Sequence, residues 1–550
     1  MKKVFDNACF LGYVNQVSPQ GVRIHFPSSK LLNNFRYEGT LFNGANVGDF
    51  VVIEGVRYGF LARIVDLSLP DSERKSIDEK SIHESESIFH PIATAELLLS
   101  FDLYRPDKLE KTVAHFPPIG AKVFACSENL LKDYIKSFGA QDDECSNVYA
   151  EIGSLSSHRL PCSVSINSIF NRHCAVVGTT GGGKSWTVAR LIENLLEKTN
   201  DKIILVDATG EYCNPCFFNS IVGVDSYFDC KYLSNADFCL LFQESSPNTV
   251  AALCDAIHSL KLKSLVPNEF SGQKIGSSQL AIQKLIHSHI HKFTNMSFDL
   301  SCLPQQIENE CVKINNRGLY EQDSFKLGYC SHLITRVNLF LCNDVFTNAL
   351  GINKKPGAKD IIDVIKEFLK SDKQILRLGF ENLPFDFSVR EVIVDLIAGH
   401  LLKEARKRIF CEHPLLLFID EAHQFTNKRI NADDATSFSL KNIDSIAKEC
   451  RKYGLFLCLA TQMPRDIPIG TLSQIGTFIV HRLINDQDRK TIENACSSAS
   501  RASLALLPVL GAGEALLLGV DFPMPLTLKI KAPTHHPNSK TPVLSREPKQ

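Results

Sequence analysis

The chain has 550 residues, of which 44% are hydrophobic and 22% charged, and its formal net charge at pH 7 is −1. A chain of this length can bury a large core and is expected to form roughly three or four domain-sized units. The near-neutral charge excludes a protein that is strongly basic throughout, but it does not exclude a local basic surface for nucleic acid.

The sequence shows neither a recognisable secretory signal nor a membrane-spanning segment. Residues 1–7 lead into no apolar region, and no apolar run reaches the roughly 18 residues of a transmembrane helix. The 18 cysteines lie mostly singly in apolar segments, which is typical of reduced, buried thiols. We therefore expect a cytoplasmic protein without membrane contact. Cys213 and Cys216 have CxxC spacing, but no second pair with zinc-ligand spacing follows, so a metal site is the less favoured interpretation.

Residues 1–150 are predicted to form a small β-barrel. Short apolar strands separated by turn residues are expected at residues 22–26, 49–54, 58–66, 92–101 and 119–126. A polar, charge-rich stretch, residues 70–87, interrupts them and is predicted to be a long exposed loop or a mobile linker. A β-sandwich is the alternative fold for this segment.

From about residue 160 strands alternate with helices, which is the pattern of a parallel sheet covered on both faces. Strands are expected at residues 174–178, 202–207, 374–380, 415–420 and 455–461, with later strands at 477–480 and 514–518. Helices are expected at residues 184–198, 389–408 and 443–452. The pattern predicts one α/β core (residues 151–234 and 373–532), a helical insertion (235–372) and a polar, extended tail (533–550).

A glycine-rich segment after the first core strand fits the P-loop pattern GxxxxGK[ST]. An apolar strand precedes it and a helix follows, as a P-loop requires. Glycines let backbone N–H groups curl round phosphates, and the helix N-terminus adds its positive end. Lys184 is expected to reach the β- and γ-phosphates of ATP, and Ser185 to ligate Mg²⁺. The predicted nucleotide-binding residues are Gly178, Thr179, Thr180, Gly181, Gly182, Gly183, Lys184, Ser185 and Trp186.

Two acids end the apolar segment 415–419. Asp420 is the predicted Mg²⁺ ligand, and Glu421 is the predicted general base that activates water. The alternative is a buried strand with an acidic cap before a turn. Gln462, after the strand at 455–461, is predicted to contact the γ-phosphate or position water, unless it is only a satisfied amide at a strand end. Asp207 and Glu211 could lie near the metal, at a subunit edge, or serve a structural role.

Taken together, these segments resemble the HerA-like branch of the FtsK/HerA superfamily. The resemblance rests on ordered motifs in the core: NRH before the P-loop strand, GTTGGGKS at 178–185, DATGEY at 207–212, FIDEAHQF at 418–425, ECRKYG at 449–454, ATQMP at 460–464 and IVHRLINDQD at 479–488. VGDFVVIEG at 47–55 and PPIGAKVFAC at 117–126 are similar to the β-barrel that precedes the core in this family. The helical insertion also matches.

The resemblance implies a RecA-like P-loop ATPase that uses ATP and Mg²⁺ and forms a homohexameric ring with ATP sites between subunits. Such sites need an arginine from the neighbouring subunit. This arginine stabilises charge on the transferred phosphoryl group and raises the rate of hydrolysis by on the order of 10³–10⁵. Arg172 and Arg451 lie where the family's trans-acting arginines are expected, and Arg482 is a weaker candidate. The alternative for each is an ordinary surface salt bridge. Two departures stand out: Ala208 and Thr209 replace a Pro-His pair frequent in the family, and the Cys213/Cys216 pair has no family explanation.

A ring motor would touch double-stranded DNA through loops that line its pore. Lys428, Arg429 and Lys441 follow the acid-pair motif in a polar segment, and phosphate contacts by such residues give binding that is salt-sensitive and independent of sequence. A second basic cluster, residues 406–408, is another candidate for pore contact, but it ends a predicted helix, where cations complement the helix C-terminus, and that structural alternative is favoured.

The resemblance predicts a DNA translocase that works with a partner nuclease or an NADase-type effector, in DNA end processing or in anti-phage defence. The chain contains no nuclease or NAD-binding motif of its own, so that chemistry would come from the partner. The alternative is a scaffold ring that assembles and activates an effector without moving along DNA. A conjugative or chromosome-segregation pump would be expected to carry a membrane anchor.

Overall fold

The computed structural model describes residues 5–19, 21–74, 89–110, 115–137, 148–156, 160–426, 429–431, 437–496, 499 and 501–539. The chain forms two compact units. The first consists of residues 1–199 and 475–534, and the second of residues 200–474 and 535–550.

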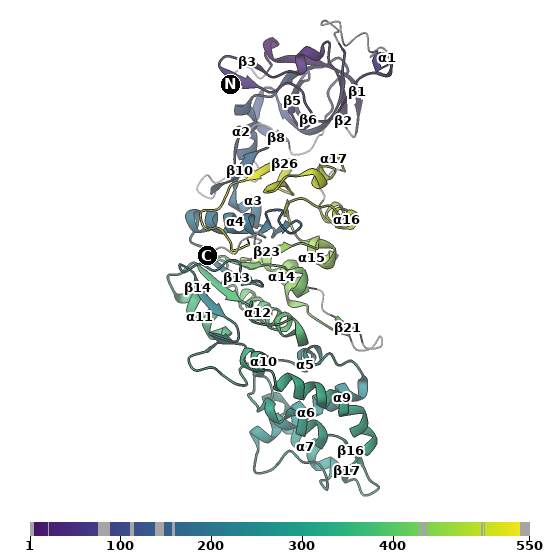
Figure 1. Ribbon diagram of the computed structural model, residues 1–550, viewed down its shortest axis with the longest axis vertical. Coiled ribbons are helices and arrows are strands. Elements are labelled where there is room, and N and C mark those ends of the chain that lie inside the picture. Colours follow the sequence, from purple (N-terminus) through teal and green to yellow (C-terminus); the bar gives the residue numbers. More distant parts are fainter. Residues whose placement is uncertain are drawn as a thin grey trace, which may run out of the picture. The chain divides into compact units, whose positions relative to one another are not determined.

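The N-terminal part of the first unit is a closed antiparallel barrel, as predicted (Figure 1). Its strand order is β2-β1-β9-β5-β6-β7, and pairing of β2 with β7 closes it, for example at Val22↔Ala95. Apolar side chains from every barrel strand fill the interior, among them Leu11, Ile24 and Val51. A seventh strand, β8 (Arg105–Glu110), extends one side by pairing with β7. The barrel strands are β1 (Phe10–Ser18), β2 (Gly21–His25), β5 (Phe50–Glu54), β6 (Tyr58–Ser68), β7 (Ile92–Asp102) and β9 (Lys122–Ala125).

The same unit contains a second set of strands, in the order β11-β10-β26-β25-β24-β12. Only β12 and β24 run parallel; β25 is antiparallel to β24, and β26 is antiparallel to β25. The late strands expected at residues 477–480 and 514–518 are present as β24 and β25, but β25 is antiparallel to its neighbours, and β26 was not predicted. Their bounds are β10 (Tyr149–Leu155), β11 (Pro161–Ser165), β12 (Cys174–Val177), β24 (Thr477–Val480), β25 (Glu514–Gly519) and β26 (Phe522–Ile530).

The second unit contains five parallel strands in the order β23-β20-β13-β19-β14. Four of them are apolar almost throughout and nearly fully buried, as expected for parallel strands covered on both faces. Because all five run the same way, their carboxyl ends lie at one edge. The strands are β13 (Lys202–Asp207), β14 (Phe218–Ile221), β19 (Ile375–Gly379), β20 (Leu415–Ile419) and β23 (Leu455–Thr461), and the helices between them include α11 (Ile361–Lys370), α12 (Val389–Arg406) and α14 (Asn442–Glu449).

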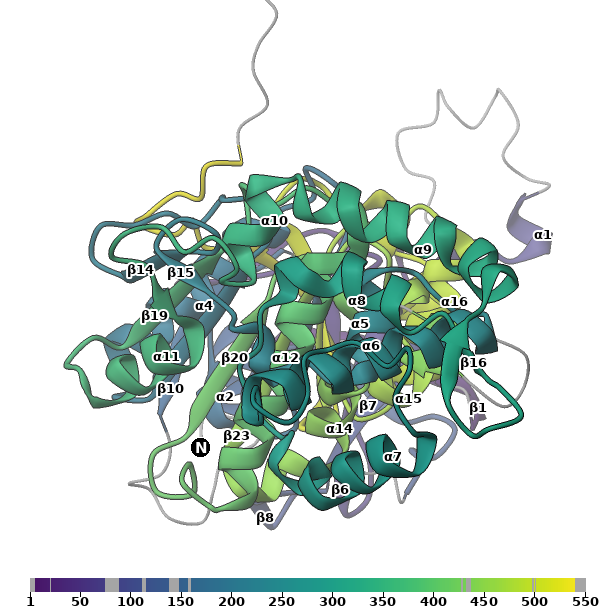
Figure 2. The same cartoon turned by 90° about the horizontal axis from the view of Figure 1, so that it is seen from below.

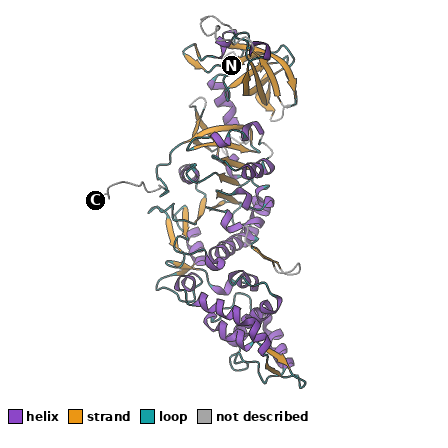
Figure 3. Cartoon of the chain, turned by 45° about the vertical axis from the view of Figure 1, so that its right-hand side comes forward, coloured by secondary structure: helices purple, strands orange, loops and turns teal. Residues whose placement is uncertain are grey.

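The predicted insertion is mostly helical (Figure 3). Helices α6, α8 and α9 pack on one another (Figure 2), and a buried ion pair between Lys274 and Glu310 ties the loop after α6 to α8. Two short strands that pair side by side flank these helices, β15 (Ser226–Tyr227) before them and β18 (Lys359–Asp360) after them; α11 follows β18, although it lies inside the predicted bounds 235–372. Its elements are α5 (Asn235–Leu241), α6 (Pro247–Leu265), α7 (Gln279–His289), α8 (Leu303–Asn309), β16 (Val312–Ile314), β17 (Tyr320–Gln322), α9 (Ser324–Leu341) and α10 (Asp344–Ala349).

Two segments differ from the prediction. Residues Asp71–Arg74 form a short helix, α1, at the start of the stretch expected to be a loop, and the remainder of that stretch from residue 75 lies outside the described residues. Glu128–Ser137 form α2 where only barrel strands were expected, because apolar side chains there recur at helical spacing: Leu131 and Ile135 are buried. Among the described residues, no helix is long and apolar enough to cross a membrane.

A buried arginine joins the barrel to the C-terminal strands within the first unit. Arg63, on β6, is only 3% exposed. Its guanidinium donates to Ser503 Oγ at 2.6 Å, to the Pro525 carbonyl at 3.3 Å and to Glu96 Oε2 at 3.3 Å. Burial lowers the pKa of Arg63, and the Glu96 carboxylate acts in the opposite direction. Arg63 also lines a cavity of about 260 Å³, so the hydrogen bonds fix this junction without filling it completely.

We expect Arg63→Ala to lower the free energy of unfolding of the first unit by on the order of 2–3 kcal/mol, because it leaves buried acceptors without a donor and enlarges the cavity. Thermal unfolding followed by circular dichroism measures this. Arg57→Ala is the control, since the Arg57 side chain is 68% exposed and its ion pair with Asp102 is 3.7 Å long; its effect should stay within about 0.5 kcal/mol. Equal effects of the two variants would contradict the anchoring role of Arg63.

Candidate active site

The P-loop begins where β12 ends, and its glycines are required by its shape. Gly181 and Gly183 have φ values of 74° and 112°, in the left-handed region that favours glycine. A Cβ on Gly178 would lie 2.5 Å from the Cβ of His481, so only glycine allows the backbone to approach so closely. The loop is therefore shaped partly by its own dihedral angles and partly by the side chain on which it packs.

Hydrogen bonds hold the loop at both of its ends. The Thr179 N–H donates to the Arg482 carbonyl at 3.1 Å, and the Gly182 N–H donates to the Thr179 carbonyl at 3.0 Å. The Gly182 carbonyl accepts from the Gly513 N–H at 3.1 Å. Thr180 and Gly181, at the tip, are exposed. The result is a preformed loop whose tip faces outward.

Lys184, Ser185 and Trp186 form the first turn of α4 (Lys184–Lys198). Lys184 is 7% exposed, which is unusual for a lysine, and it sits at the positive end of the helix with Gly183 as the N-cap. Ser185 and Trp186 are half-buried. A glycine loop, a buried lysine and a helix N-terminus together fit the phosphates of a nucleotide, and the Ser185 hydroxyl is a ligand type that Mg²⁺ accepts.

The two predicted acids and Gln462 lie together in the second unit. Asp420 and Glu421 follow β20 and are 5% and 7% exposed. Glu421 has a φ of 47°, which is rare outside glycine and indicates a conformation held by its surroundings. The Gln462 side-chain N–H donates to Glu421 Oε1, and His423 Nδ1 lies 3.3 Å from Glu421 Oε2. Contacts with both of its oxygens fix the orientation of the Glu421 carboxylate.

The contact of Gln462 with Glu421 was not predicted: the amide was expected to face phosphate or water, or to be satisfied at the strand end. The contribution of His423 was also missed. Thr461 Oγ1 lies 3.2 Å from His423 Nδ1, so the imidazole links the end of β23 to the acid pair. The sequence signal was the position of His423, two residues after Glu421.

Asp207 serves a structural role, the last of the alternatives considered for it. Its fully buried carboxylate accepts from the N–H groups of Gly210 (2.8 Å), Glu211 (3.2 Å) and Tyr212 (3.0 Å), and from Arg377 Nε (2.7 Å). Arg377, 1% exposed on β19, also donates to Glu381 Oε1 at 3.0 Å. Burial alone would lower the pKa of Arg377, but the two carboxylates outweigh it and the pKa is raised. Arg377 was not predicted as a functional residue, although an arginine within the otherwise apolar segment 375–379 is an unusual feature of the sequence.

The segment that departs from the family pattern is held by a second buried arginine. Arg390 Nη1 donates to the Ala208 carbonyl at 3.2 Å, and Arg390 packs over the Phe385 ring. Glu211 is half-buried, and its Oε2 atom is buried without a hydrogen bond among the described residues. Cys213 and Cys216 are exposed free thiols, and no cluster of three or more potential metal ligands occurs in the described part of the chain.

The three arginines considered as trans-acting lie at different places. Arg172 is half-buried in the turn before β12, where its carbonyl accepts from the Gly476 N–H. Arg451 is exposed in the 3₁₀ turn Cys450–Tyr453, and Arg482 is exposed directly after His481. Within the described residues, none of the three side chains makes a hydrogen bond or an ion pair.

The predicted basic segments differ in their surroundings. Lys428 lies outside the described residues; Arg429 begins β21 (Arg429–Asn431), which pairs with β22 (Ser437–Ser439), and Lys441 is exposed at the start of α14. At the end of α12, Arg406 pairs with Glu449 at 2.8 Å and Lys407 with Glu404 at 2.7 Å. Two members of the second cluster are therefore ion-paired at the end of a helix, the place at which the sequence favoured a structural role.

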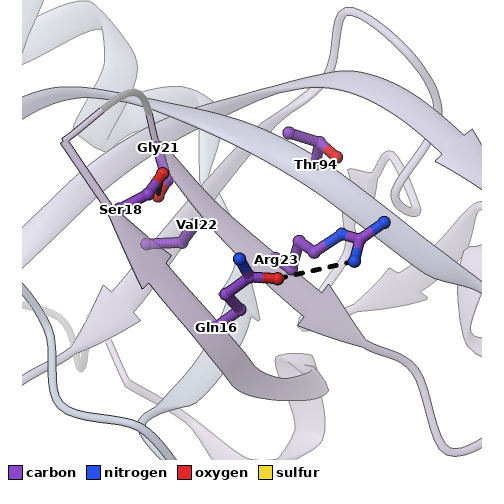
Figure 4. Close-up of a pocket in the computed structure, with 6 residues that line it drawn as sticks. All are labelled: Gln16, Ser18, Gly21, Val22, Arg23 and Thr94. Carbon is purple, nitrogen blue, oxygen red and sulfur yellow. Dashed lines mark hydrogen bonds between the residues drawn. The ribbon is translucent and has the colours of Figure 1, made fainter.

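The barrel has a shallow polar cavity of about 200 Å³ on strands β1, β2 and β7 (Figure 4). Arg23 donates to Gln16 Oε1 at 3.4 Å, and the Ser18 hydroxyl donates to the Gly21 carbonyl at 3.0 Å. It contains neither the glycine loop nor the helix terminus of a phosphate site, so the nucleotide chemistry belongs to the P-loop.

Comparison with known proteins agrees with this assignment. The family model described as "Helicase HerA, central domain" matches residues 150–376, and "Helicase HerA-like C-terminal" matches residues 410–547. The chain belongs to the HerA family of helicases. It is accordingly an ATPase of the helicase and DNA-translocase type, with ATP and Mg²⁺ as cofactors, and the P-loop geometry fits that chemistry.

Relatives within the HerA family are distant in sequence. A probable helicase of Methanocaldococcus jannaschii is 28% identical over 406 residues, covering 70% of this chain and 71% of that protein. The DNA double-strand break repair helicase HerA of Sulfolobus acidocaldarius is 24% identical over 406 residues, covering 71% of this chain and 72% of that protein.

Among solved structures, VirB4 of Thermoanaerobacter pseudethanolicus is 14% identical with a TM-score of 0.43, covering 72% of this chain and 98% of that one. The plasmid coupling protein TrwB is 14% identical with a TM-score of 0.44, covering 76% and 95%.

For the buried ion pair, we expect Asp207→Ala to lower the free energy of unfolding of the second unit by about 3 kcal/mol, because Arg377 and three N–H groups lose their acceptor. Chemical denaturation with an intrinsic-fluorescence or circular dichroism readout measures this. Asp363→Ala provides the control, since its pair with Lys366 is solvent-exposed and should contribute no more than about 0.5 kcal/mol. A shift for Asp207→Ala as small as that of the control would contradict the structural role.

Proposed function

We propose that the chain is the motor subunit of a homohexameric ring that hydrolyses ATP to move along double-stranded DNA and works with a partner nuclease or NADase-type effector. The observation that carries the proposal is the joint presence, in one HerA-family chain, of a preformed P-loop with a buried lysine and a buried acid pair held by Gln462. The barrel is assigned to residues 1–150 and the insertion to residues 235–372, with the ATPase core built from residues 151–234 and 373–532.

Each residue of the machinery has a proposed role. The P-loop from Gly178 to Trp186 binds the nucleotide, with Lys184 on the β- and γ-phosphates. Ser185 and Asp420 ligate Mg²⁺, and Glu421 takes the proton of the attacking water. Gln462 orients Glu421, which its hydrogen bond to Oε1 supports. Arg172 and Arg451 stabilise charge on the phosphoryl group of a neighbouring subunit, and the half-buried or exposed position of these side chains supports that role.

DNA contact is proposed for Lys428, Arg429 and Lys441, at or beside the β21–β22 hairpin. The exposure of Lys441 supports phosphate contact rather than a role in the core. Several relatives of this chain are named for DNA double-strand break repair, which supports DNA end processing as the setting; anti-phage defence is the other proposed setting. In either case we place the protein in the cytoplasm.

A second function, a scaffold ring that activates an effector without stepping along DNA, is favoured by the barrel surface. Val56, Tyr104 and Ile119 are 88%, 82% and 73% exposed. We propose that these exposed apolar side chains of the barrel would dock the partner protein. The two functions differ in their response to DNA.

The deciding experiment combines native mass with ATPase rate, each measured with and without ATP, Mg²⁺ and double-stranded DNA. A hexamer whose turnover rises with DNA, with a response that falls at higher salt, is the expected result. A hexamer whose ATPase rate does not change with DNA would contradict the translocase function and favour the scaffold function. A chain that stays monomeric under all conditions would contradict a ring formed by this subunit alone.

For the catalytic residues, Lys184→Ala is expected to abolish measurable turnover, and Glu421→Gln to bind ATP but hydrolyse it at least about a hundredfold more slowly, since general-base contributions are typically 10²–10⁴. Nucleotide binding and phosphate release are measured separately. Normal turnover of Glu421→Gln would mean that the base lies elsewhere. Glu412→Gln, an exposed acid before β20, is a matched control and should retain full activity.

Mixing variants tests whether the arginines act between subunits. Arg172→Ala and Arg451→Ala should each lose turnover while retaining ATP binding. When either is mixed with Glu421→Gln subunits, some sites combine an intact base with an intact arginine, so part of the activity should return. No recovery at any ratio would exclude action in trans.

A further inference from the structure

His481 lies fully buried beneath the P-loop, where the nucleotide chemistry described above does not use it. The residue follows β24 and has no exposed surface. A Cβ placed on Gly178 would lie 2.5 Å from the His481 Cβ, one on Gly183 would lie 3.2 Å from its Cε1, and one on Gly182 would lie 3.5 Å from its Cβ. The backbone of three P-loop glycines thus rests on a single side chain.

Both nitrogens of the His481 ring are used. Nδ1 lies 2.8 Å from the carbonyl oxygen of Glu514 at the start of β25. A carbonyl oxygen only accepts, so Nδ1 carries the proton and donates. Nε2 lies 2.8 Å from the hydroxyl of Thr187 and, in this neutral tautomer, accepts from it. The two bonds fix the orientation of the ring.

Thr187 transmits this contact to the phosphate-binding turn. It is fully buried in the first turn of α4, three residues after Lys184, and its N–H donates to the Gly183 carbonyl at 3.0 Å. Gly513, next to the Glu514 acceptor, donates to the Gly182 carbonyl at 3.1 Å. His481 therefore connects β24, β25, the P-loop and α4 at one point.

The surroundings keep the ring uncharged. Burial, together with the nearby Lys184 ammonium, lowers the pKa of His481 to about 4, against the opposing hydrogen bonds to backbone groups. At neutral pH the ring is the neutral donor–acceptor that the two contacts require, and Lys184 remains the cation of the loop.

We propose that His481 is a positioning residue for ATP binding: through its Nε2–Thr187 bond and its contact with three glycines, it holds the P-loop and the first turn of α4 in the shape that receives the phosphates. It does not touch the nucleotide. The inference rests on the ATPase activity of the family and concerns residues of the first unit alone. The competing explanation is that His481 is an ordinary core residue that contributes only to stability.

Asparagine and glutamine separate the two bonds of His481. The Asn side chain places an amide at the level of Nδ1, so His481→Asn keeps a donor for Glu514 and loses the acceptor for Thr187. The Gln side chain places an amide at the level of Nε2, so His481→Gln keeps an acceptor for Thr187. Thr187→Val removes the hydroxyl at nearly constant volume and breaks the same bond from the other side.

Binding of a non-hydrolysable ATP analogue with Mg²⁺ to the full-length chain is measured for each variant, together with KM, kcat and the thermal unfolding midpoint. We expect His481→Asn and Thr187→Val each to raise Kd about tenfold, the effect of one lost buried hydrogen bond. KM should rise in parallel, whereas kcat should change by less than about threefold. His481→Gln should stay within about threefold of the wild type in Kd. The two substitutions break the same hydrogen bond. The Kd of the double variant His481→Asn/Thr187→Val for the analogue should therefore be no higher than that of the single variant with the higher Kd.

Three results would overturn the proposal: analogue binding by His481→Asn within threefold of the wild type, equal losses for His481→Asn and His481→Gln, or effects of His481→Asn and Thr187→Val that multiply in the double variant. His258→Asn is the control for loss of a partly buried imidazole, since His258 lies in α6 of the insertion and bonds Asn235. It should leave Kd unchanged. If a variant lowers the unfolding midpoint without changing Kd, His481 is a stability residue only.

Discussion

Parallel strands buried on both faces carry apolar side chains along nearly their whole length, so polar chemistry is confined to the places where the strands end. In the second unit this constraint brings Asp207, Asp420 and Thr461 to the ends of β13, β20 and β23. In the first unit it places the P-loop after β12 and His481 after β24. The polar residues of the candidate site are therefore found at the ends of the strands.

At these ends, loops take their shape from buried side chains of neighbouring strands. The Asp207 carboxylate gathers the N–H groups of residues 210–212, and Arg377 balances its charge at a distance of 2.7 Å. His481 supports the P-loop without any charge. An ion pair holds its loop strongly, but removal of one partner leaves an unpaired buried charge. A neutral imidazole, in contrast, adds no electrostatic repulsion next to the Lys184 ammonium. The two loops therefore illustrate a charged and an uncharged solution to the same structural problem.

The sequence predicted those parts of the site whose residues are contiguous. The P-loop, Lys184 and the Asp420–Glu421 pair carry their chemistry within one short segment, and the strands around them were found because apolar runs alternate with amphipathic helices. The fold class and the barrel were predicted for the same reason, although strands such as β1, β10, β11 and β14 were not. His481 and Thr187 are 294 residues apart, and Arg377 and Asp207 are 170 apart. Those pairs form because β24 lies beside β12 and β19 lies beside β13. The spacing of apolar residues within a segment predicts a strand, but it does not predict which strands are neighbours. The antiparallel return of β25 and β26 was missed for the same reason.

The paired strands β15 and β18 have a consequence for how such a chain can change over evolution. Ser226 pairs with Lys359 and Tyr227 with Asp360, so the two ends of the segment that holds these helices meet at one place in the second unit. Lys231 strengthens this neck by pairing with Asp229 at 3.1 Å and Asp360 at 3.6 Å. A segment whose two ends already meet can lengthen, shorten or be exchanged at little entropic cost to the sheet. Selection can thus remodel the insertion while leaving β13, β19 and β20 unchanged, and different lineages can vary this segment around a constant catalytic frame.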